Sequence, residues 1–270
     1  MHSTGEHMKA EADRPEVSVV TVCFNAAAAL PRTIASIEEQ TLTAREWVVV
    51  DGGSRDNTVA LVKSAWPAPA AFVSEPDRGI YDAMNKGVAL SKGELLFFLN
   101  ADDRFFDADV LTDVVHAFAL RPAMNFLLGG VVVEARQQRF LHSHRHVNRW
   151  TLPFVDPCHQ AVVVRRRLFD EIGPFDLRWP TSADYDWFLR VSRAGHRLHH
   201  LDRVLAFYPD GGAHAADPAA LAKERLALRS CYVSPAALAA GTLFTRVAHR
   251  LSKSLRGGLG WGQQRLPGVA

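Results

Sequence analysis

The sequence predicts an α/β fold built on a parallel, twisted sheet with helices on both faces, a three-layer arrangement. First, apolar, β-branched runs of strand length alternate with amphipathic stretches of helix length through the N-terminal part of the chain. Such alternation builds parallel sheets with right-handed crossovers. Second, polar residues directly follow the apolar runs, at the carboxyl ends of the predicted strands, and open sheets of this type bind ligands at these ends. Third, the 270 residues are 48% hydrophobic, enough for one domain with a short appendage or for two small domains.

The elements expected in the N-terminal part alternate strictly. In order, they are a strand over 17–24, a helix over 25–40, a strand over 47–50, a helix over 57–65, a strand over 70–74, a helix over 80–91 and a strand over 94–99. The second strand ends at Asp51 and a Gly-Gly-Ser turn, after which Asp56 or Asn57 can cap the next helix. The last strand is wholly apolar, so we expect it at the centre of the sheet.

The rhythm changes after about residue 125. Here we expect strands over 126–134 and 160–165, a helix over 183–194 and a strand over 199–208. From Pro218 the chain becomes rich in Ala, Leu and Arg, which predicts terminal helices. The predicted organisation is therefore a tail over 1–15, one α/β domain over 16–217 and a helical segment over 218–270.

Charge and cysteine content narrow the class of protein. Lys and Arg total 31 against 29 Asp and Glu, so a net charge of +2 gives no reason to expect a nucleic-acid partner. The three cysteines, Cys23, Cys158 and Cys231, have no metal-site or disulfide-framework spacing. Residues 1–14 contain no apolar run of the length of a signal-peptide core, and no run in the chain approaches the length of a spanning helix. We therefore expect a cytoplasmic protein.

The sharpest local signal is the pair Asp102 and Asp103, which an apolar strand delivers into a loop. Adjacent carboxylates repel each other and lose hydration when buried, so they favour a compensating cation. A hard divalent ion suits them, since it takes oxygen ligands from carboxylates and substrate phosphates. The alternative is a helix cap before Val110, which accounts for one Asp more readily than for two.

Six segments in this order and spacing resemble glycosyltransferase family 2. They are VSVVTVCFN, VVVDGGSRDNT, EPDRGIYDAMNKG, GELLFFLNADD, HQAVVVRRRLFDEIGPFD and SADYDWFLR, and the resemblance covers roughly residues 17–212. It implies the GT-A fold, a Rossmann-like α/β/α sandwich, with a nucleoside-diphosphate sugar as donor, Mn²⁺ or Mg²⁺ as cofactor and inversion at the anomeric carbon. The relatives with the most similar motifs build bacterial surface polysaccharides on lipid carriers.

By position, the resemblance assigns five residues to the donor nucleotide. Thr21 and Asn25 should line the nucleoside pocket, and Asp51 should accept a hydrogen bond from a uracil-type base. Ser54 follows in the same loop, and Arg78 should face the base or the diphosphate, where a cationic fork suits phosphate oxygens. The alternatives are a turn or cap residue for Asp51 and a solvated surface arginine for Arg78.

In the carboxylate loop, the resemblance assigns Asp102 mainly to the ribose and Asp103 mainly to the metal, with Asp102 as a further metal ligand. Asn100 stands where many relatives have the first Asp of a D-x-D pattern, and its amide oxygen can still serve ribose or metal. The ion would offset the charge that develops on the departing diphosphate.

The second chemical centre is residues 182–190, SADYDWFLR. The resemblance makes Asp184 the base that takes the proton from the attacking hydroxyl. Most relatives carry Glu where this chain has Ala183. Asp184 can also cap the helix that follows. Asp186 is a weaker candidate for the base, because two residues along a helix it points about 200° away.

Four further residues are candidates near the acceptor or diphosphate. His159 and Gln160 resemble a pair on that side of the site in many relatives, although a histidine before an apolar strand is commonly structural. His214 falls where some GT-A enzymes place a loop histidine near the metal. Trp187 can stack on a sugar ring, while core packing is the commoner fate of tryptophan.

Residues 236–256 have an apolar stripe opposite a basic face at helical spacing. This pattern suits a helix in the interface of an anionic membrane, and equally a helix packed on the domain with solvated charges. Peripheral attachment to the inner membrane face would bring the enzyme close to a lipid-linked acceptor.

The sequence therefore predicts a hexosyltransferase-type enzyme that transfers a sugar to a hydroxyl of a glycan or lipid-linked acceptor in cell-surface polysaccharide biosynthesis. The expected donor is a nucleoside-diphosphate sugar, with a UDP-sugar favoured. No G-x-G-x-x-G follows the first strand, which argues against a dinucleotide-dependent oxidoreductase. A metal-dependent phosphoesterase and a noncatalytic nucleotide-sugar-binding module remain as alternatives.

Overall fold

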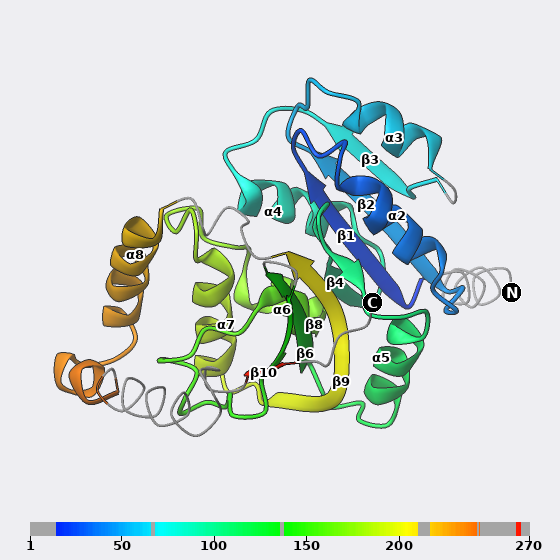
Figure 1. Ribbon diagram of the computed structural model, residues 1–270. Helices are drawn as coiled ribbons and strands as arrows, with labels where there is room; N and C mark the ends of the chain where they lie inside the picture. The colour runs from blue at the N-terminus through cyan, green and yellow to red at the C-terminus, as the bar shows by residue number, and fades with distance from the viewer. Residues whose placement is uncertain are drawn as a thin grey trace, which may run out of the picture.

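The computed structural model describes residues 15–65, 68–135, 138–209, 217–241, 243 and 263–265, in which one curled, mixed sheet runs through the molecule (Figure 1). Its strands are β1 Val17–Cys23, β2 Arg45–Asp51, β3 Ala71–Ser74, β4 Leu95–Phe98, β5 Arg104–Phe105, β6 Phe126–Ala135, β7 Gln138–Ser143, β8 Val162–Arg165, β9 Leu198–Pro209 and β10 Gln263–Arg265. The helices are α2 Leu30–Glu38, α3 Thr58–Ser64, α4 Ile80–Leu90, α5 Val110–Ala119, α6 Arg167–Ile172, α7 Ala183–Arg193 and α8 Pro218–Ser230, with a 3₁₀ turn, η1, at His159–Ala161.

The strand order, β10-β7-β6-β8-β4-β1-β2-β3, joins two halves of different character. Strands β4, β1, β2 and β3 are parallel, as the alternating elements predict. Strand β8 then pairs antiparallel with both β4 and β6, and β9 pairs with β6 and β5. The α/β prediction is confirmed, with a parallel half that comes first in the chain and a mixed half that follows.

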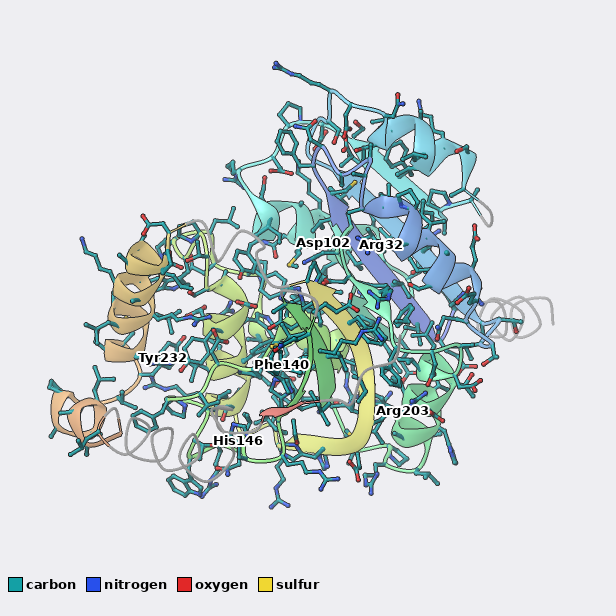
Figure 2. All side chains as sticks on the ribbon, in the orientation of Figure 1. Arg32, Asp102, Phe140, His146, Arg203 and Tyr232 are labelled. Carbon is teal, nitrogen blue, oxygen red and sulfur yellow. The ribbon has the colours of Figure 1, made fainter. Side chains whose placement is uncertain are left out.

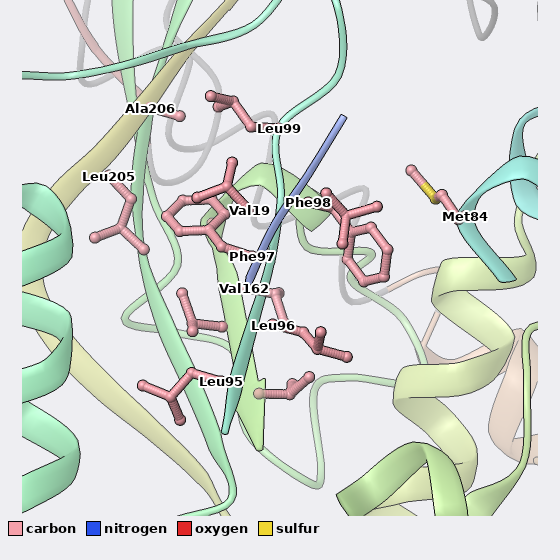
Figure 3. Packing of buried hydrophobic residues seen from close by; sticks show 14 of the residues in the cluster. Val19, Met84, Leu95, Leu96, Phe97, Phe98, Leu99, Val162, Leu205 and Ala206 are labelled. Carbon is pink, nitrogen blue, oxygen red and sulfur yellow. The ribbon is translucent and has the colours of Figure 1, made fainter. Parts of the chain in front are cut away.

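Strand β4 lies at the junction of the halves and is buried on both faces, as its uninterrupted apolar sequence predicts. Figure 3 shows Phe97 on the side of Leu205 and Phe98 on the side of Met84 of α4. Phe97 packs edge-on against Phe105, with ring centroids 5.1 Å apart. The loop that leaves β4 is therefore anchored in the core.

Two local features explain the course of the N-terminal half. The helix expected from Asn25 begins only at Leu30: Asn25 has a left-handed φ of 47°, which Asn tolerates better than most residues, and residues 27–29 form a turn before the helix. In α4, a Cβ on Gly87 would lie 2.4 Å from Cγ1 of Val20, so the glycine allows α4 to pack closely on β1.

Helix α8, the first part of the predicted C-terminal segment, packs against the sheet-bearing part of the chain. Asp217 caps the helix by accepting the N–H groups of Ala219 and Ala220. Glu224 accepts the N–H of Thr181 at 3.0 Å, and Arg229 donates to the carbonyl of Phe154 at 3.2 Å. The domain boundary after residue 217 stays a prediction. Among the described helices, none is long and apolar enough to cross a membrane.

Candidate active site

A cleft of about 750 Å³ opens at the carboxyl ends of β1 and β4, between the two halves of the sheet. This is the edge where the sequence predicts ligand binding. Figure 2 places Asp102 near the junction of the two halves. The predicted site residues that line the cleft are Asn25, Asn100, Asp102, Asp103, His159, Gln160 and Asp184. Residues from opposite ends of the family-like region thus meet in one cavity.

The two carboxylates after β4 have different surroundings. Asp102 is exposed, whereas the side chain of Asp103 is buried, accepting from the backbone N–H of Asn100 at 3.1 Å and from Nε2 of Gln160 at 3.2 Å. Burial, with the charge of Asp102, raises the pKa of Asp103 to about 7. Thr33 of α2 holds the loop from behind, since its hydroxyl lies 2.6 Å from the carbonyl oxygen of Asp103. Asp102, expected mainly at the ribose, is thus the carboxylate that faces the cleft, whereas Asp103, expected mainly at the metal, is bonded to Asn100 and Gln160 and fixes the loop.

The donor set of this loop fits a hard divalent cation. Asp102 presents a carboxylate to the cleft, and Oδ1 of Asn100 is buried with no hydrogen-bond partner among the described residues. No three His, Cys, Asp or Glu side chains of the described chain gather closely enough to hold an ion by themselves. An ion here would need further oxygens from water or phosphate, which is how Mg²⁺ is commonly held beside nucleotides.

Asp184 lies at the N-terminus of α7 with its side chain 8% exposed. Tyr81 of α4 donates its hydroxyl to Oδ1 at 2.7 Å, and the backbone N–H of Tyr185 donates to the same oxygen at 2.8 Å. Nδ1 of His159 lies 3.4 Å from Oδ2. These contacts fix the plane of the carboxylate at the cleft wall. Asp186 is instead bound by Arg190 and Tyr232, and it does not line the cleft.

His159 and Gln160 connect the two carboxylate centres. The ring of His159 lies between Asp184 and Asn100, whose Nδ2 is 3.0 Å from Nε2, while Gln160 binds Asp103. Burial opposes protonation of His159, but the hydrogen bond and charge of Asp184, with the charge of Asp103, outweigh it and raise its pKa. The pair predicted from the sequence therefore joins the loop after β4 to the N-terminus of α7.

Three of the residues assigned to the nucleotide belong to one hydrogen-bonded network, namely Asn25, Asp51 and Ser54. The carboxylate of Asp51 is fully buried and accepts from the N–H of Ser54 at 2.9 Å and the hydroxyl of Ser74 at 2.7 Å. Burial alone would raise the pKa of Asp51, but the hydrogen bonds that the carboxylate accepts outweigh burial. The pKa of Asp51 therefore lies below its usual value. Asn25 accepts from the N–H of Arg55 at 2.9 Å, which ties the loops after β1 and β2 together. Of these residues, only Asn25 lines the cleft.

Three further predicted residues do not line the cleft. Thr21 does not line the cleft: it is fully buried and accepts from Nε1 of Trp47 at 3.0 Å. Trp187 belongs to the core rather than to a sugar platform, because it is 1% exposed and stacks on Phe169 at 4.3 Å. The exposed guanidinium of Arg78 lies 2.7 Å from the largely buried carboxylate of Asp82, and Arg78 does not line the cleft. His214 lies outside the described residues.

The sequence analysis missed Tyr81, which lies in the family-like segment EPDRGIYDAMNKG. Its hydroxyl reaches across the structure to Asp184, 103 positions later in the chain. Burial, followed by the charge of Asp184, raises the pKa of Tyr81, so the phenol stays protonated and donates. A buried Tyr must find a partner for its hydroxyl, but the sequence does not say which one.

Comparison with known proteins gives consistent results. The chain matches the family described as "Glycosyl transferase family 2" over residues 18–173. It is 35% identical over 205 residues to a PGL/p-HBAD biosynthesis glycosyltransferase of Mycobacterium tuberculosis, covering 73% of this chain and 78% of that protein. It is 36% identical over 189 residues to an uncharacterized glycosyltransferase of the same species, covering 66% of this chain and 69% of that protein.

Solved structures agree at the level of the fold. Residues 1–349 of Staphylococcus aureus TarS, in complex with UDP-GlcNAc, superpose with a TM-score of 0.64 at 16% identity, covering 90% of this chain and 76% of that one. The mannosyltransferase PcManGT from Pyrobaculum calidifontis, in complex with GDP-Man and Mn²⁺, superposes with a TM-score of 0.60 at 21% identity, covering 90% of this chain and 83% of that one. A longer TarS chain is matched over 36% of its length. The expected GT-A fold is confirmed.

Proposed function

Because the chain belongs to glycosyl transferase family 2, we propose that it transfers a sugar from a UDP-sugar to a hydroxyl of a glycan or lipid-linked acceptor in cell-surface polysaccharide biosynthesis. One observation carries the proposal: Asp102 and Asp184, from opposite halves of the sheet, line the same cleft. This arrangement supports a reaction in which Asp102 serves the donor diphosphate and Asp184 serves as the base.

The donor end is formed by the loops after β1 and β4. We propose that Asn25, Asn100 and Asp102 contact the nucleotide, with the Asp51–Ser54 turn as their support. Asp102 and Oδ1 of Asn100 would hold Mn²⁺ or Mg²⁺, and Asp103 would keep their loop in place. The ion supplies positive charge opposite the departing diphosphate.

At the other end, Asp184 acts as the base. It takes the proton of the acceptor hydroxyl while the hydroxyl oxygen bonds to the anomeric carbon from the face opposite the diphosphate. The bond between that carbon and the diphosphate oxygen breaks, and its electron pair leaves with the diphosphate. The anomeric configuration inverts. Tyr81 and His159 hold the carboxylate at the required angle.

Donor turnover tests the proposal directly. The purified protein is mixed with UDP- and GDP-sugars, with Mn²⁺ or EDTA, and thermal stabilisation and nucleoside-diphosphate release are measured. We expect a UDP-sugar to stabilise the fold and to release UDP in the presence of metal and an acceptor glycoside. Release of inorganic phosphate from a simple ester without sugar transfer would instead indicate a phosphoesterase. Metal-dependent UDP binding without turnover would indicate a binding module.

A further inference from the structure

The cleft continues beyond Asp184 to a pair of charged side chains that the proposed donor site does not use. Asp156, in the loop before η1, forms an ion pair with Arg225 of α8, with 2.5 Å between Oδ2 and Nη2. Both side chains line the cleft. Figure 1 shows α8 beside α7, on the side away from β1, β2 and β3. The ion pair therefore lies at the end of the cleft opposite the proposed nucleotide site.

This ion pair has unused hydrogen-bonding capacity. Oδ1 of Asp156 and Nε of Arg225 are buried and have no partner in the part of the chain that the structure describes. Leaving such atoms unpaired is costly, so an unpaired buried group calls for an explanation. The two side chains keep 11% and 32% of their surface exposed. Both side chains line the cleft, so their exposed atoms are within reach of a ligand there.

This end of the cleft carries charges of both signs. Asp156 and Asp184 lie near Arg225, His159 and Arg229, and Arg229 donates to the carbonyl of Phe154 and the hydroxyl of Tyr185. A hydroxyl can donate to the carboxylate of Asp156 and accept from the guanidinium of Arg225 together, so this ion pair suits the hydroxyl groups of a sugar. Leu221 lines the same end and offers an apolar surface to the C–H groups of a sugar ring.

We propose that Asp156 and Arg225 form the acceptor subsite, binding hydroxyl groups of the neutral sugar ring whose own hydroxyl Asp184 deprotonates. The proposal rests on the function proposed above. It assigns half of the subsite to α8, which follows the part of the chain matched by the family. The ligand class is a neutral glycosyl residue at the end of a glycan or glycolipid.

Binding measurements test the subsite separately from catalysis. The full chain is saturated with UDP and Mg²⁺, and a panel of octyl glycosides of neutral hexoses and deoxyhexoses is titrated by saturation-transfer NMR. We expect at least one glycoside to bind. Asp156→Asn and Arg225→Lys should weaken its binding by about tenfold or more, while UDP affinity stays within about twofold. Arg225→Lys keeps the positive charge but loses the planar fork.

The matched control is Lys223→Ala, which removes an exposed cation from the same helix and should leave glycoside binding unchanged. A thermal melt of each variant checks folding, and Arg225→Lys keeps the test open if Asp156→Asn does not fold. Equal glycoside binding by wild type and both variants, or no binding to wild type, overturns the subsite. Displacement of the glycoside by octyl phosphate overturns the assignment to a neutral ring. Glycoside binding that persists while no donor sugar is ever transferred contradicts the proposed function instead.

Discussion

Asp184 owes its position to three separate parts of the chain. The backbone N–H of Tyr185 comes from α7 itself, the hydroxyl of Tyr81 from α4 and the ring of His159 from η1. A carboxylate held by several donors keeps one orientation, and orientation is a large part of what a positioned base contributes to rate.

Asp184→Asn should lower sugar transfer by about 100-fold or more, because an amide cannot take the hydroxyl proton. UDP affinity, measured with Mn²⁺ by calorimetry, should stay unchanged, since Asp184 lies at the start of α7 and not in the donor loops after β1 and β4. A folded variant with wild-type turnover would show that the base lies elsewhere.

Tyr81→Phe should lower kcat by about tenfold and leave the donor KM nearly unchanged. The reason is that Phe fills the same space but no longer holds Oδ1 of Asp184. Steady-state kinetics at saturating donor separates the two constants. Phe175 packs on the Tyr81 ring at 5.6 Å, so Phe175→Leu serves as a control for packing alone. If the control loses as much kcat as Tyr81→Phe, the hydroxyl has no positioning role.

Asp102→Asn should raise the Mn²⁺ concentration needed for half-maximal transfer by about tenfold or more, because the exposed carboxylate is the group free to meet an ion. Asp103→Asn should lower the melting temperature as well as transfer, since its carboxylate holds the loop. Activity measured across a manganese titration, with a thermal melt of each protein, compares the two positions. Identical metal titrations for wild type and Asp102→Asn would remove this residue from the site.

At the residue scale, the motifs predicted the identity of the site residues well, but they predicted the directions of the side chains less well. Asp102 and Asp184 follow from polar groups at a strand end and a helix start, which a sequence displays directly. Thr21 and Trp187 do not, because β1 and the first turns of α7 are buried on every side. Because these elements have no exposed face, the alternation of residues along the strand and the 3.6-residue period of the helix do not show which side chains face the cleft and which face the core.

At the element scale, the segment that carries His159 is braced by a buried histidine after β7. Nδ1 of His144 donates to the carbonyl of Gly129 at 2.9 Å, and Nε2 accepts the N–H of Cys158 at 3.3 Å. Only a neutral ring can do both. Burial lowers the pKa of His144 to about 4. The brace between β6, β7 and η1 therefore depends on an unprotonated side chain.

This brace predicts acid sensitivity. In the unfolded chain His144 takes up a proton near pH 6.5, while in the folded chain it does so only near pH 4, so its contribution is constant above pH 6.5 and falls as the pH decreases to 4. The loss should be on the order of 3 kcal/mol over that interval. Urea unfolding at several pH values measures it. His144→Gln, which keeps one donor and one acceptor, should flatten the profile, and an unchanged slope would rule out this histidine as the cause.

The elements that the sequence predicted less well share a physical reason. Strand β7 has Gln, Arg and His beside only two apolar residues, and helix α6 is only six residues long, so neither shows a clear period. They form because β6 offers an edge and α7 offers a face. The parallel strands could be predicted without knowledge of their neighbours, because each has an apolar run of its own.

At the scale of the whole molecule, we propose that residues 236–256 attach the enzyme peripherally to the inner face of a membrane. Most of this segment lies outside the described residues. Deletion of residues 236–270 should abolish sedimentation with anionic liposomes and leave UDP binding intact, because α8 and the cleft precede the deletion. Liposome binding should weaken with salt and be absent on neutral vesicles. Failure of the full chain to bind anionic vesicles would leave a packed terminal helix as the alternative.

Helix α8 has a further consequence, which concerns how enzymes of this kind diversify. The donor loops and the candidate base come from one stretch of chain, and Arg225 comes from a later helix that packs through a few polar contacts and the buried side chain of Leu228. A gene can therefore exchange that helix by recombination and keep its activated sugar while changing the molecule that receives it. Chimeras between relatives, joined at the start of α8, offer a practical route to new glycosylation patterns with an unaltered donor.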